Sequence, residues 1–447
     1  MDEYEYWHPL HETMPRPQIE ALQLVKLRAA VGWALTGNGL QAELLRSAGV
    51  TPNSLESLAD ISKIPFLTRD AWMESQCAAP PYGDLLAAPP ESAIRHHLTS
   101  GTTGRTPIRV LDSMKDWEWI AEMWCYAFWG FGVRPADRVF VAFGYGSFIG
   151  FWGAHYACEK IGCLVLPGGS LTTEMRLRQI VELGATVVCS TPTYALRLAQ
   201  EARRLGIDLP AGPVERIVLS GEPAGSIPAT KRLLESEWGA KAADTAGMTE
   251  LGTIMMFECA AQPGGTHVIE DHFLEEVIDP DTGSPVPYGT LGERVVTSFG
   301  RGFIPLLRYR TGDLVTRVPG SDCSCGRTWD IYHGGIHGRV DDMKLVRGTN
   351  VYPRAIEAIV REYPVVDEFQ VHLYTAEGIR DEIEVLVELT DPGDRKVLPE
   401  LATELAKATE GLRIDVRAVE PGTLPRFELK ARRVRDERTV IGTGAPL

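Results

Sequence analysis

Residues 138–143 read RVFVAF, the first of four short apolar runs that decide the fold. The others are LVLP at 164–167, TVVCS at 186–190 and RIVLS at 216–220. Stretches of helical length separate these runs, and apolar strands that alternate with amphipathic helices are typical of a parallel sheet with helices on both faces. The sequence therefore predicts a doubly wound α/β sheet between about residues 95 and 239.

The segments that flank this sheet have other patterns. Residues 1–90 are predicted to be a helical cap, because residues 19–35 place apolar side chains at three- and four-residue spacing. Residues 273–318 consist of short strands with turns at 279–283 and 287–289, which predicts an antiparallel, barrel-like subregion with mixed strand directions. The cap, the sheet and this subregion form one predicted N-terminal domain, residues 1–338.

A smaller domain is expected after Gly338. The segments 348–351, 367–373 and 382–389 are strand-like, while 353–362 and 397–409 are helical in pattern. This β-α-β-β-α order over about a hundred residues is a normal size for an independent domain. We therefore expect a small α+β C-terminal domain at residues 339–447.

Length, charge and composition exclude several classes of protein. The chain has 447 residues, more than one core usually supports, and its 60 acidic and 45 basic residues give a net charge of -15. That sign repels phosphate backbones and anionic membranes, so neither nucleic acid nor membrane is an expected partner. Residues 1–17 lack the apolar core of a signal peptide, which favours a cytoplasmic protein. We expect this protein to be a monomer or a homodimer.

One uncharged segment, residues 139–158, is long enough to span a bilayer. It contains four glycines together with Tyr145, Ser147 and His155. We interpret it as a buried strand, a glycine-rich turn and the start of a helix.

The segment TSGTTGRT at 99–106 is dense in hydroxyls and glycines. Glycine backbones approach an anion closely, hydroxyls donate hydrogen bonds, and Arg105 adds a permanent positive charge. The spacing differs from that of the Walker loop, which disfavours P-loop NTPase chemistry. A plain turn is an equally acceptable reading of this segment alone.

Five ordered motifs together carry a resemblance. After the 99–106 segment come AGMTE at 246–250, RYRTGD at 308–313, GRVDD at 338–342 and PRFELK at 425–430. In this order they resemble the adenylate-forming superfamily. Within it the chain is most similar to phenylacetate-coenzyme A ligases, through the segments ETM 12–14, EALQ 20–23, IPF 64–66, GAHY 153–156, EDHF 270–273 and DDM 341–343.

The resemblance implies roles for individual residues. The residues implied to bind ATP are Ser100, Gly101, Thr102, Thr103, Gly104, Gly221, Glu222, Pro223, Arg310, Asp313 and Arg339. Thr249, Glu250 and Lys430 are implied to be catalytic, with Glu250 also holding Mg²⁺, and Asp341 is the implied hinge. A carboxylate such as Asp313 can accept hydrogen bonds from both ribose hydroxyls, whereas Lys430 can stabilise charge that moves between carboxylate and phosphate. The family places glycine before this lysine, but the chain has Leu429, which puts the local loop shape in doubt.

An aromatic cluster lies near the glycine-rich turn of residues 144–150. Clusters of this kind are more often ordinary core. The match to the family's acyl pocket shifts the interpretation towards an aromatic acid. The predicted pocket residues are Tyr145, Phe148, Trp152, His155 and Gly247.

Cys259, His267, Cys323 and Cys325 form a possible zinc set. Three thiols and an imidazole give four soft ligands without an open position, which indicates a structural site. The C-x-C spacing is unusual for zinc, and unrelated reduced cysteines are the alternative. The other five cysteines lie in apolar surroundings and are expected only to pack.

These observations predict an AMP-forming acid–thiol ligase. The resemblance implies that ATP activates an aromatic carboxylic acid and that the acyl group passes to coenzyme A. A carrier protein or an amine is the alternative acceptor, and another oxyacid is an alternative substrate. A zinc-stiffened nucleotide-binding protein without turnover is the remaining alternative, supported only by Leu429.

Overall fold

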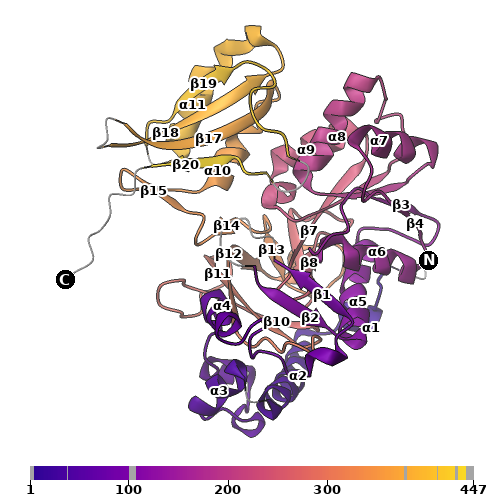
Figure 1. The fold of residues 1–447 in the computed structure, drawn as a ribbon, viewed down its shortest axis with the longest axis vertical. Helices are drawn as coiled ribbons and strands as arrows, with labels where there is room; N and C mark the ends of the chain where they lie inside the picture. Colours follow the sequence, from indigo (N-terminus) through magenta and orange to yellow (C-terminus); the bar gives the residue numbers. More distant parts are fainter. Residues whose placement is uncertain are drawn as a thin grey trace.

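The structure is a computed structural model, and it describes residues 5–37, 39–99, 107–376, 380–409, 411–427 and 431–438. Figure 1 shows a large body with a smaller C-terminal unit above it. We call the C-terminal unit the lid and the remainder the body.

The body contains one twelve-stranded mixed sheet. Five strands run in the order β7-β6-β5-β3-β4, all parallel: β3 (Arg138–Val141), β4 (Leu164–Pro167), β5 (Val187–Ser190), β6 (Arg216–Ser220) and β7 (Lys241–Met248). The four apolar runs form β3 to β6, so the predicted doubly wound sheet is confirmed.

Both faces of the parallel half are covered because alternate residues of each strand point to opposite sides. Val139 and Val141 of β3 pack into a core with α5 (Met114–Gly130) and α6 (Gly150–Ile161). Phe140, between them, packs into a second core. That core is shared with α7 (Thr173–Glu182), α8 (Pro192–Leu205) and α9 (Pro228–Trp238).

The other half of the sheet is antiparallel. Its strands are β8 (Thr253–Phe257), β9 (Gly265–Val268), β10 (Phe273–Ile278), β11 (Leu291–Ser298), β12 (Tyr309–Val318), β13 (Ile331–His333) and the short β14 (Gly338–Arg339). This half corresponds to the predicted barrel-like subregion. In the described parts of the chain its strands continue the sheet from β7 and do not close on themselves, because β8 and β9 pair with β7 and β13.

Helices precede the sheet and cover one end of the body (Figure 1). They are α1 (Pro9–Glu12), α2 (Arg16–Thr36), α3 (Leu40–Ser47) and α4 (Arg69–Ala78). The hairpin of β1 (Arg95–Leu98) and β2 (Arg109–Asp112) follows. Turns of 3-10 helix lie at Pro52–Ser54, Leu58–Lys63, Pro90–Ser92, Pro223–Ser226, Gly320–Asp322 and Pro392–Val397.

The uncharged segment 139–158 forms most of β3, a loop and the first turns of α6, as interpreted from its glycines. Among the described residues, no helix combines the length and the apolar character that crossing a membrane requires.

The lid is built on a four-stranded sheet in the order β19-β18-β17-β20. Its elements are β15 (Lys344–Val346), β16 (Thr349–Val351), α10 (Pro353–Val360), β17 (Val366–Ala376), β18 (Arg380–Leu389), α11 (Leu398–Ala408), β19 (Asp415–Val419) and β20 (Val434–Glu437). The sequence predicts the β17–β18 hairpin and both helices, but not the two edge strands. Both edge strands are short and pair in parallel with the hairpin from a distance along the chain.

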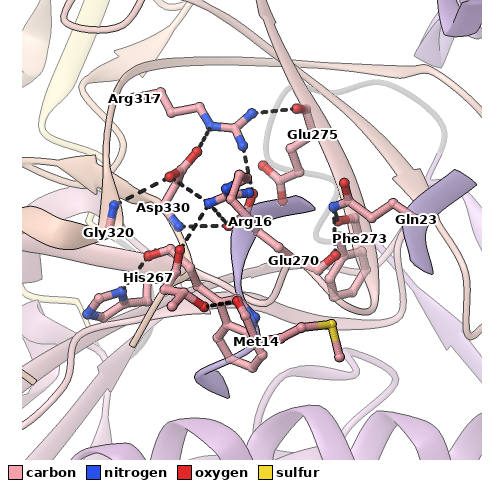
Figure 2. A network of polar contacts seen from close by, with 12 residues as sticks. Met14, Arg16, Gln23, His267, Glu270, Phe273, Glu275, Arg317, Gly320 and Asp330 are labelled. Carbon is pink, nitrogen blue, oxygen red and sulfur yellow. Dashed lines mark hydrogen bonds and ion pairs between the residues drawn. The ribbon is translucent and has the colours of Figure 1, made fainter. Parts of the chain in front are cut away.

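A network of ion pairs joins the N-terminal helices to the antiparallel half (Figure 2). Arg16 at the start of α2 contacts Glu270 at 2.7 Å and Asp330 at 2.8 Å. Arg317 of β12 contacts the same two carboxylates, each at 2.7 Å. Both carboxylates are buried, so the two guanidinium groups compensate charges that would otherwise be costly to desolvate.

Replacing Glu270 tests this network. In Glu270→Gln, Arg16 and Arg317 would lose a shared carboxylate, and we expect the free energy of unfolding to fall by about 2 to 4 kcal/mol. The control is Arg178→Ala, which breaks the exposed Arg178–Glu174 pair on α7 and should cost no more than about 0.5 kcal/mol. Urea unfolding followed by circular dichroism measures both, and equal effects would contradict the prediction.

Candidate active site

Three predicted segments meet at one edge of the sheet. Because β3, β5, β6 and β7 are parallel, the residues that follow each strand emerge at the same edge. Tyr145 follows β3, residues 221–223 follow β6, and Thr249 and Glu250 follow β7. Open α/β sheets bind ligands outside this carboxyl edge, and the structure therefore gathers three of the predicted motifs where a ligand site is expected.

Glu250 is buried and faces a cation that the sequence analysis did not single out. Nη1 of Arg69, on the first turn of α4, lies 2.6 Å from Oε1 of Glu250. The second carboxylate oxygen has no hydrogen-bond partner among the described residues. Desolvation raises the pKa of the neighbouring Tyr309 well above its usual value; Glu250 and Asp313 raise it further, whereas Arg69 and Arg339 oppose them. These four charged groups thus share one environment.

Asp313 and Arg339 lie opposite each other where β12 pairs with β14. Nη1 of Arg339 is 3.3 Å from Oδ1 of Asp313, and its Nε donates to Asp341 at 2.8 Å. Burial raises the pKa of Asp313, and the Arg339 charge partly opposes this. Gly312 has φ +76°, and a Cβ there would lie 3.1 Å from the Arg339 guanidinium. The structure therefore brings the predicted ribose carboxylate, Arg339 and the predicted hinge together.

Arg310 lies apart from that group in its contacts. Its guanidinium ion-pairs with Glu293 on β11 and donates to the carbonyl of Pro280 at 2.7 Å. An arginine held by a nearly buried carboxylate is anchored structurally. Its role towards ATP stays a prediction.

A buried arginine holds the turn after β7 in place. Nη1 of Arg301 donates to the carbonyl oxygens of Thr249 at 3.2 Å and Glu250 at 2.8 Å. Its Nε pairs with Asp112 at the end of β2, 2.7 Å away. No sequence motif surrounds Arg301. Its importance comes from contacts with residues about 50 and 189 positions away along the chain.

Asp244 is a third residue that the sequence did not single out. It lies on β7 beside the 221–226 segment, and one carboxylate oxygen accepts a hydrogen bond from Ser226. The other oxygen is buried without a partner among the described residues. Burial raises its pKa to about 7; Ser226 opposes this, nearby Glu258 adds to it, and Arg354 and Lys231 oppose it. A Cβ at Gly225 would lie 2.5 Å from the free oxygen, so glycine keeps the space open.

The predicted acyl-pocket side chains form one aromatic cluster. The ring centres of Tyr145 and Trp152 are 4.9 Å apart. The Tyr145 hydroxyl lies 2.9 Å from Nδ1 of His155, whose Nε2 is 3.2 Å from Glu159. Phe148 contacts Phe143 at 5.9 Å between ring centres. All four predicted side chains are only partly buried.

Gly247, the fifth predicted pocket residue, lies on β7 where its backbone approaches β8 closely. A Cβ there would lie 2.5 Å from the carbonyl oxygen of Thr253. Its neighbour Met248 packs on the same core as Tyr145, Phe148 and Trp152.

Several predicted residues lie outside the described residues. They are Ser100, Gly101, Thr102, Thr103, Gly104, Arg105, Leu429 and Lys430. Along the chain, residues 100–106 come between strands β1 and β2.

The four predicted zinc ligands converge, although they come from segments 64 residues apart. Sγ of Cys259 lies 3.6 Å from Sγ of Cys323, and Sγ of Cys325 lies 3.3 Å from Nε2 of His267. Their ligand atoms all lie within 4.8 Å of one another. A tetrahedral zinc site with ordinary bond lengths places its donor atoms about 3.5 to 3.8 Å apart, so the spacing fits.

The histidine of this cluster is oriented for metal binding. Nδ1 of His267 lies 3.0 Å from the carbonyl oxygen of Trp329, so the proton belongs on Nδ1 and Nε2 faces the sulfurs. Burial lowers the pKa of His267. Hydrogen bonds to the Cys323 and Cys325 thiols raise this pKa by more than burial lowers it, so the net pKa is about 9. The sulfurs therefore favour positive charge at the His267 ring.

A second group, His11, Asp271 and His272, also brings three donor atoms together. Here the indole nitrogen of Trp119 donates to Nδ1 of His272 at 2.9 Å. The proton of neutral His272 must then be on Nε2, which faces Asp271 at 3.3 Å. Nε2 has no lone pair for a metal, so this group is a hydrogen-bonded chain.

The chain matches two families along its sequence. Residues 40–300 match the AMP-binding enzyme family, and residues 348–438 match the AMP-binding enzyme C-terminal domain. Phenylacetate-coenzyme A ligase of Thermus thermophilus is 35% identical over 97% of this chain and 99% of its own length. The enzyme of the same name from Pseudomonas putida is 35% identical over 96% and 97%. The chain belongs to the AMP-binding enzyme family and, within it, to the phenylacetate-coenzyme A ligases.

Solved structures of 2-hydroxyisobutyryl-CoA ligase also resemble the chain. In the postadenylation state with 2-HIB-AMP that enzyme superposes with a TM-score of 0.91, at 29% identity over 98% of this chain and 93% of that one. In its thioesterification state the TM-score is 0.74, at 30% identity over 98% and 94%. Because coverage is nearly equal, the difference indicates a closer match to the postadenylation arrangement of the domains.

Arg301→Lys tests the positioning of Thr249 and Glu250. Lysine keeps the charge beside Asp112 but cannot donate to that carboxylate and to two carbonyls from one planar group. We expect ATP-dependent pyrophosphate release to fall about 10- to 100-fold. Arg317→Lys is the control, because it weakens a buried network elsewhere in the body. A similar loss of pyrophosphate release by both folded variants would show that Arg301 acts on stability alone.

Proposed function

We propose that the chain is an AMP-forming ligase that activates an aromatic carboxylic acid with ATP and transfers the acyl group to coenzyme A. The observation that carries this proposal is the carboxyl edge of the sheet. There a buried carboxylate after β7, an aspartate–arginine pair on β12 and β14, and an aromatic cluster after β3 lie on one ligand-binding side.

The nucleotide site is assigned from its charges. Asp313 accepts hydrogen bonds from the ribose hydroxyls. The unpartnered oxygen of Asp244 can accept a hydrogen bond from the amino group at the edge of the adenine ring. Glu250 would hold Mg²⁺ through its free oxygen, and the ion would neutralise ATP phosphates there. Ser100 to Gly104 hold the phosphates by backbone and hydroxyl hydrogen bonds, with Arg69 and Arg339 adding positive charge beside them.

The acid occupies the aromatic cluster around Tyr145 and Trp152. Flat rings offer large contact area to a planar substrate. The hydrogen bond between Tyr145 and His155 fixes the orientation of the Tyr145 ring. The Tyr145 hydroxyl can also form a hydrogen bond with a polar substituent of the acid. The relatives' name, phenylacetate-coenzyme A ligase, supports an aromatic acid.

Two half-reactions follow. An oxygen of the carboxylate attacks the α-phosphorus, the bond to pyrophosphate breaks, and an acyl adenylate forms; Lys430 stabilises the charge that develops between the two reactants. The thiol of coenzyme A then attacks the acyl carbon and AMP leaves. We propose that a lid from residue 339 onward turns about Asp341 between the halves, against a body of residues 1–338, because hinges lie at the ends of elements.

Zinc at Cys259, His267, Cys323 and Cys325 is the structural part of the proposal. The donor spacing and the His267–Trp329 hydrogen bond support it. The metal would tie the loop after β8 to the segment after β12, both of which belong to the antiparallel half. A cytoplasmic enzyme, monomeric or homodimeric, is in keeping with eight unpaired cysteines.

An acid panel tests the main proposal. With ATP and Mg²⁺ we expect phenylacetate or a ring-substituted relative to give faster pyrophosphate release than 2-hydroxyisobutyrate, because the pocket is aromatic. Lys430→Ala should lower the rate about 100- to 1000-fold while ATP still binds. Mass spectrometry of products with and without coenzyme A identifies the acceptor. A preference for the aliphatic acid would refute the assigned pocket, and no turnover at all would favour the non-catalytic alternative.

Metal analysis tests the zinc site. We expect one zinc per chain by mass spectrometry of the purified protein, and its loss in Cys323→Ser together with a lower unfolding temperature. Cys77→Ser is the matched control, since Cys77 is exposed and distant from the cluster in sequence. Wild-type protein without zinc would exclude the site.

A further inference from the structure

Glu222 makes hydrogen bonds to the body and to the lid at the same time. Its Oε1 accepts from the backbone N–H of Thr193 at the start of α8, 2.8 Å away. Its Oε2 accepts from the backbone N–H of Ala431 in the lid, 3.1 Å away. The side chain implied to belong to the ATP site thus uses both oxygens between the two parts of the chain.

Charges around this contact come from both sides of the interface. Arg433, buried in the lid, contacts Glu368 at 2.8 Å and Glu357 at 3.0 Å, and its Nη1 reaches the Thr193 hydroxyl at 3.4 Å. Burial raises the pKa of Glu222, while the Arg433 charge and the Thr193 amide oppose the rise. An ionised Glu222 is therefore stabilised by groups that meet only when the lid lies in this orientation.

Two other contacts across the interface lack these properties. Arg232 pairs with Glu362 at 2.7 Å, but both side chains are more than half exposed. Exposed pairs of this kind contribute little to stability. Gln200 donates to Asp367 at 2.7 Å without a formal charge of its own. Glu222 is the carboxylate of the body that binds the lid backbone beside a buried arginine.

The position of the bond along the chain gives it a consequence. Ala431 directly follows Lys430, so a hydrogen bond to the Ala431 amide restrains the backbone next to the proposed catalytic lysine. The domain arrangement is also the one that matches the postadenylation structures better than the thioesterification structure.

We propose that Glu222 is a positioning residue: a latch that holds the lid in the orientation used for adenylation and releases it for thioester formation. This inference rests on the proposed two-step function. The carboxylate acts through the Ala431 amide and Arg433, not by touching ATP.

Hydrogen exchange of the resting enzyme tests the latch without any substrate. In Glu222→Gln the amide would replace one acceptor oxygen with a donor group, so the Ala431 N–H should exchange faster in overlapping peptides. Strand β20 is the internal reference, because its pairing with β17 lies within the lid. Thr193→Val, which removes the hydroxyl that contacts Arg433 and Glu222 but keeps the backbone N–H, should change exchange in the same direction to a smaller extent and serves if Glu222→Gln does not fold.

The two half-reactions then separate positioning from structure. We expect Glu222→Gln to lower pyrophosphate release about 10- to 100-fold and to affect coenzyme A thioester formation from a synthetic acyl adenylate far less. Glu362→Gln, at the exposed interface pair, should change neither rate.

Unchanged exchange at Ala431, or equal loss in both half-reactions, would overturn the latch. If wild-type enzyme adenylated no acid, the proposed function would fail, while the exchange result would still report whether Glu222 holds the lid.

Discussion

The common direction of β3, β5, β6 and β7 is the constraint on which the rest of the molecule depends. A helix that returns along a face of the sheet follows each of β3, β5 and β6, and β7 runs parallel to them, so all four strands end at the same edge. Tyr145, Thr193, Glu222 and Glu250 lie two to four residues after the ends of these four strands. The proposed acid pocket, the contact with the lid and the carboxylate proposed to lie beside ATP therefore arise at one edge without a dedicated scaffold for each.

Buried ion pairs attach the antiparallel half of the sheet to the neighbouring segments of the body. Arg301 links Asp112 of the β1–β2 hairpin to the carbonyls of Thr249 and Glu250, so the strand that follows the proposed phosphate loop and the turn after β7 share one guanidinium. Arg16 and Arg317 join α2 to the carboxylates of Glu270 and Asp330 (Figure 2). Such pairs are costly to desolvate, and their value here is geometric, because a planar guanidinium satisfies several acceptors in fixed directions.

The strands and motifs were readable from the sequence where local pattern was sufficient. Runs 164–167 and 216–220 match β4 and β6 residue for residue, because each apolar run is bounded by turn or loop residues, even though β6 is mostly buried and the edge strand β4 is not. Edge strands β19 and β20 were missed, since their partners lie far along the chain and their polar residues show no such pattern. Arg69, Asp244 and Arg301 were missed for the same reason: each matters through a partner at least 18 residues away.

The sequence by itself determined the order of strands and helices, the motif order that indicates an adenylate-forming enzyme, and a cysteine–histidine set of the right composition. These depend on residue type and spacing, which the chain carries locally. Only the tertiary structure decided that the cysteines and histidine converge, that Arg310 is held by Glu293, and that Glu222 faces the lid. The reason is physical: hydrogen bonds and ion pairs act over a few ångströms, and only the packed fold brings residues distant in the chain within that range.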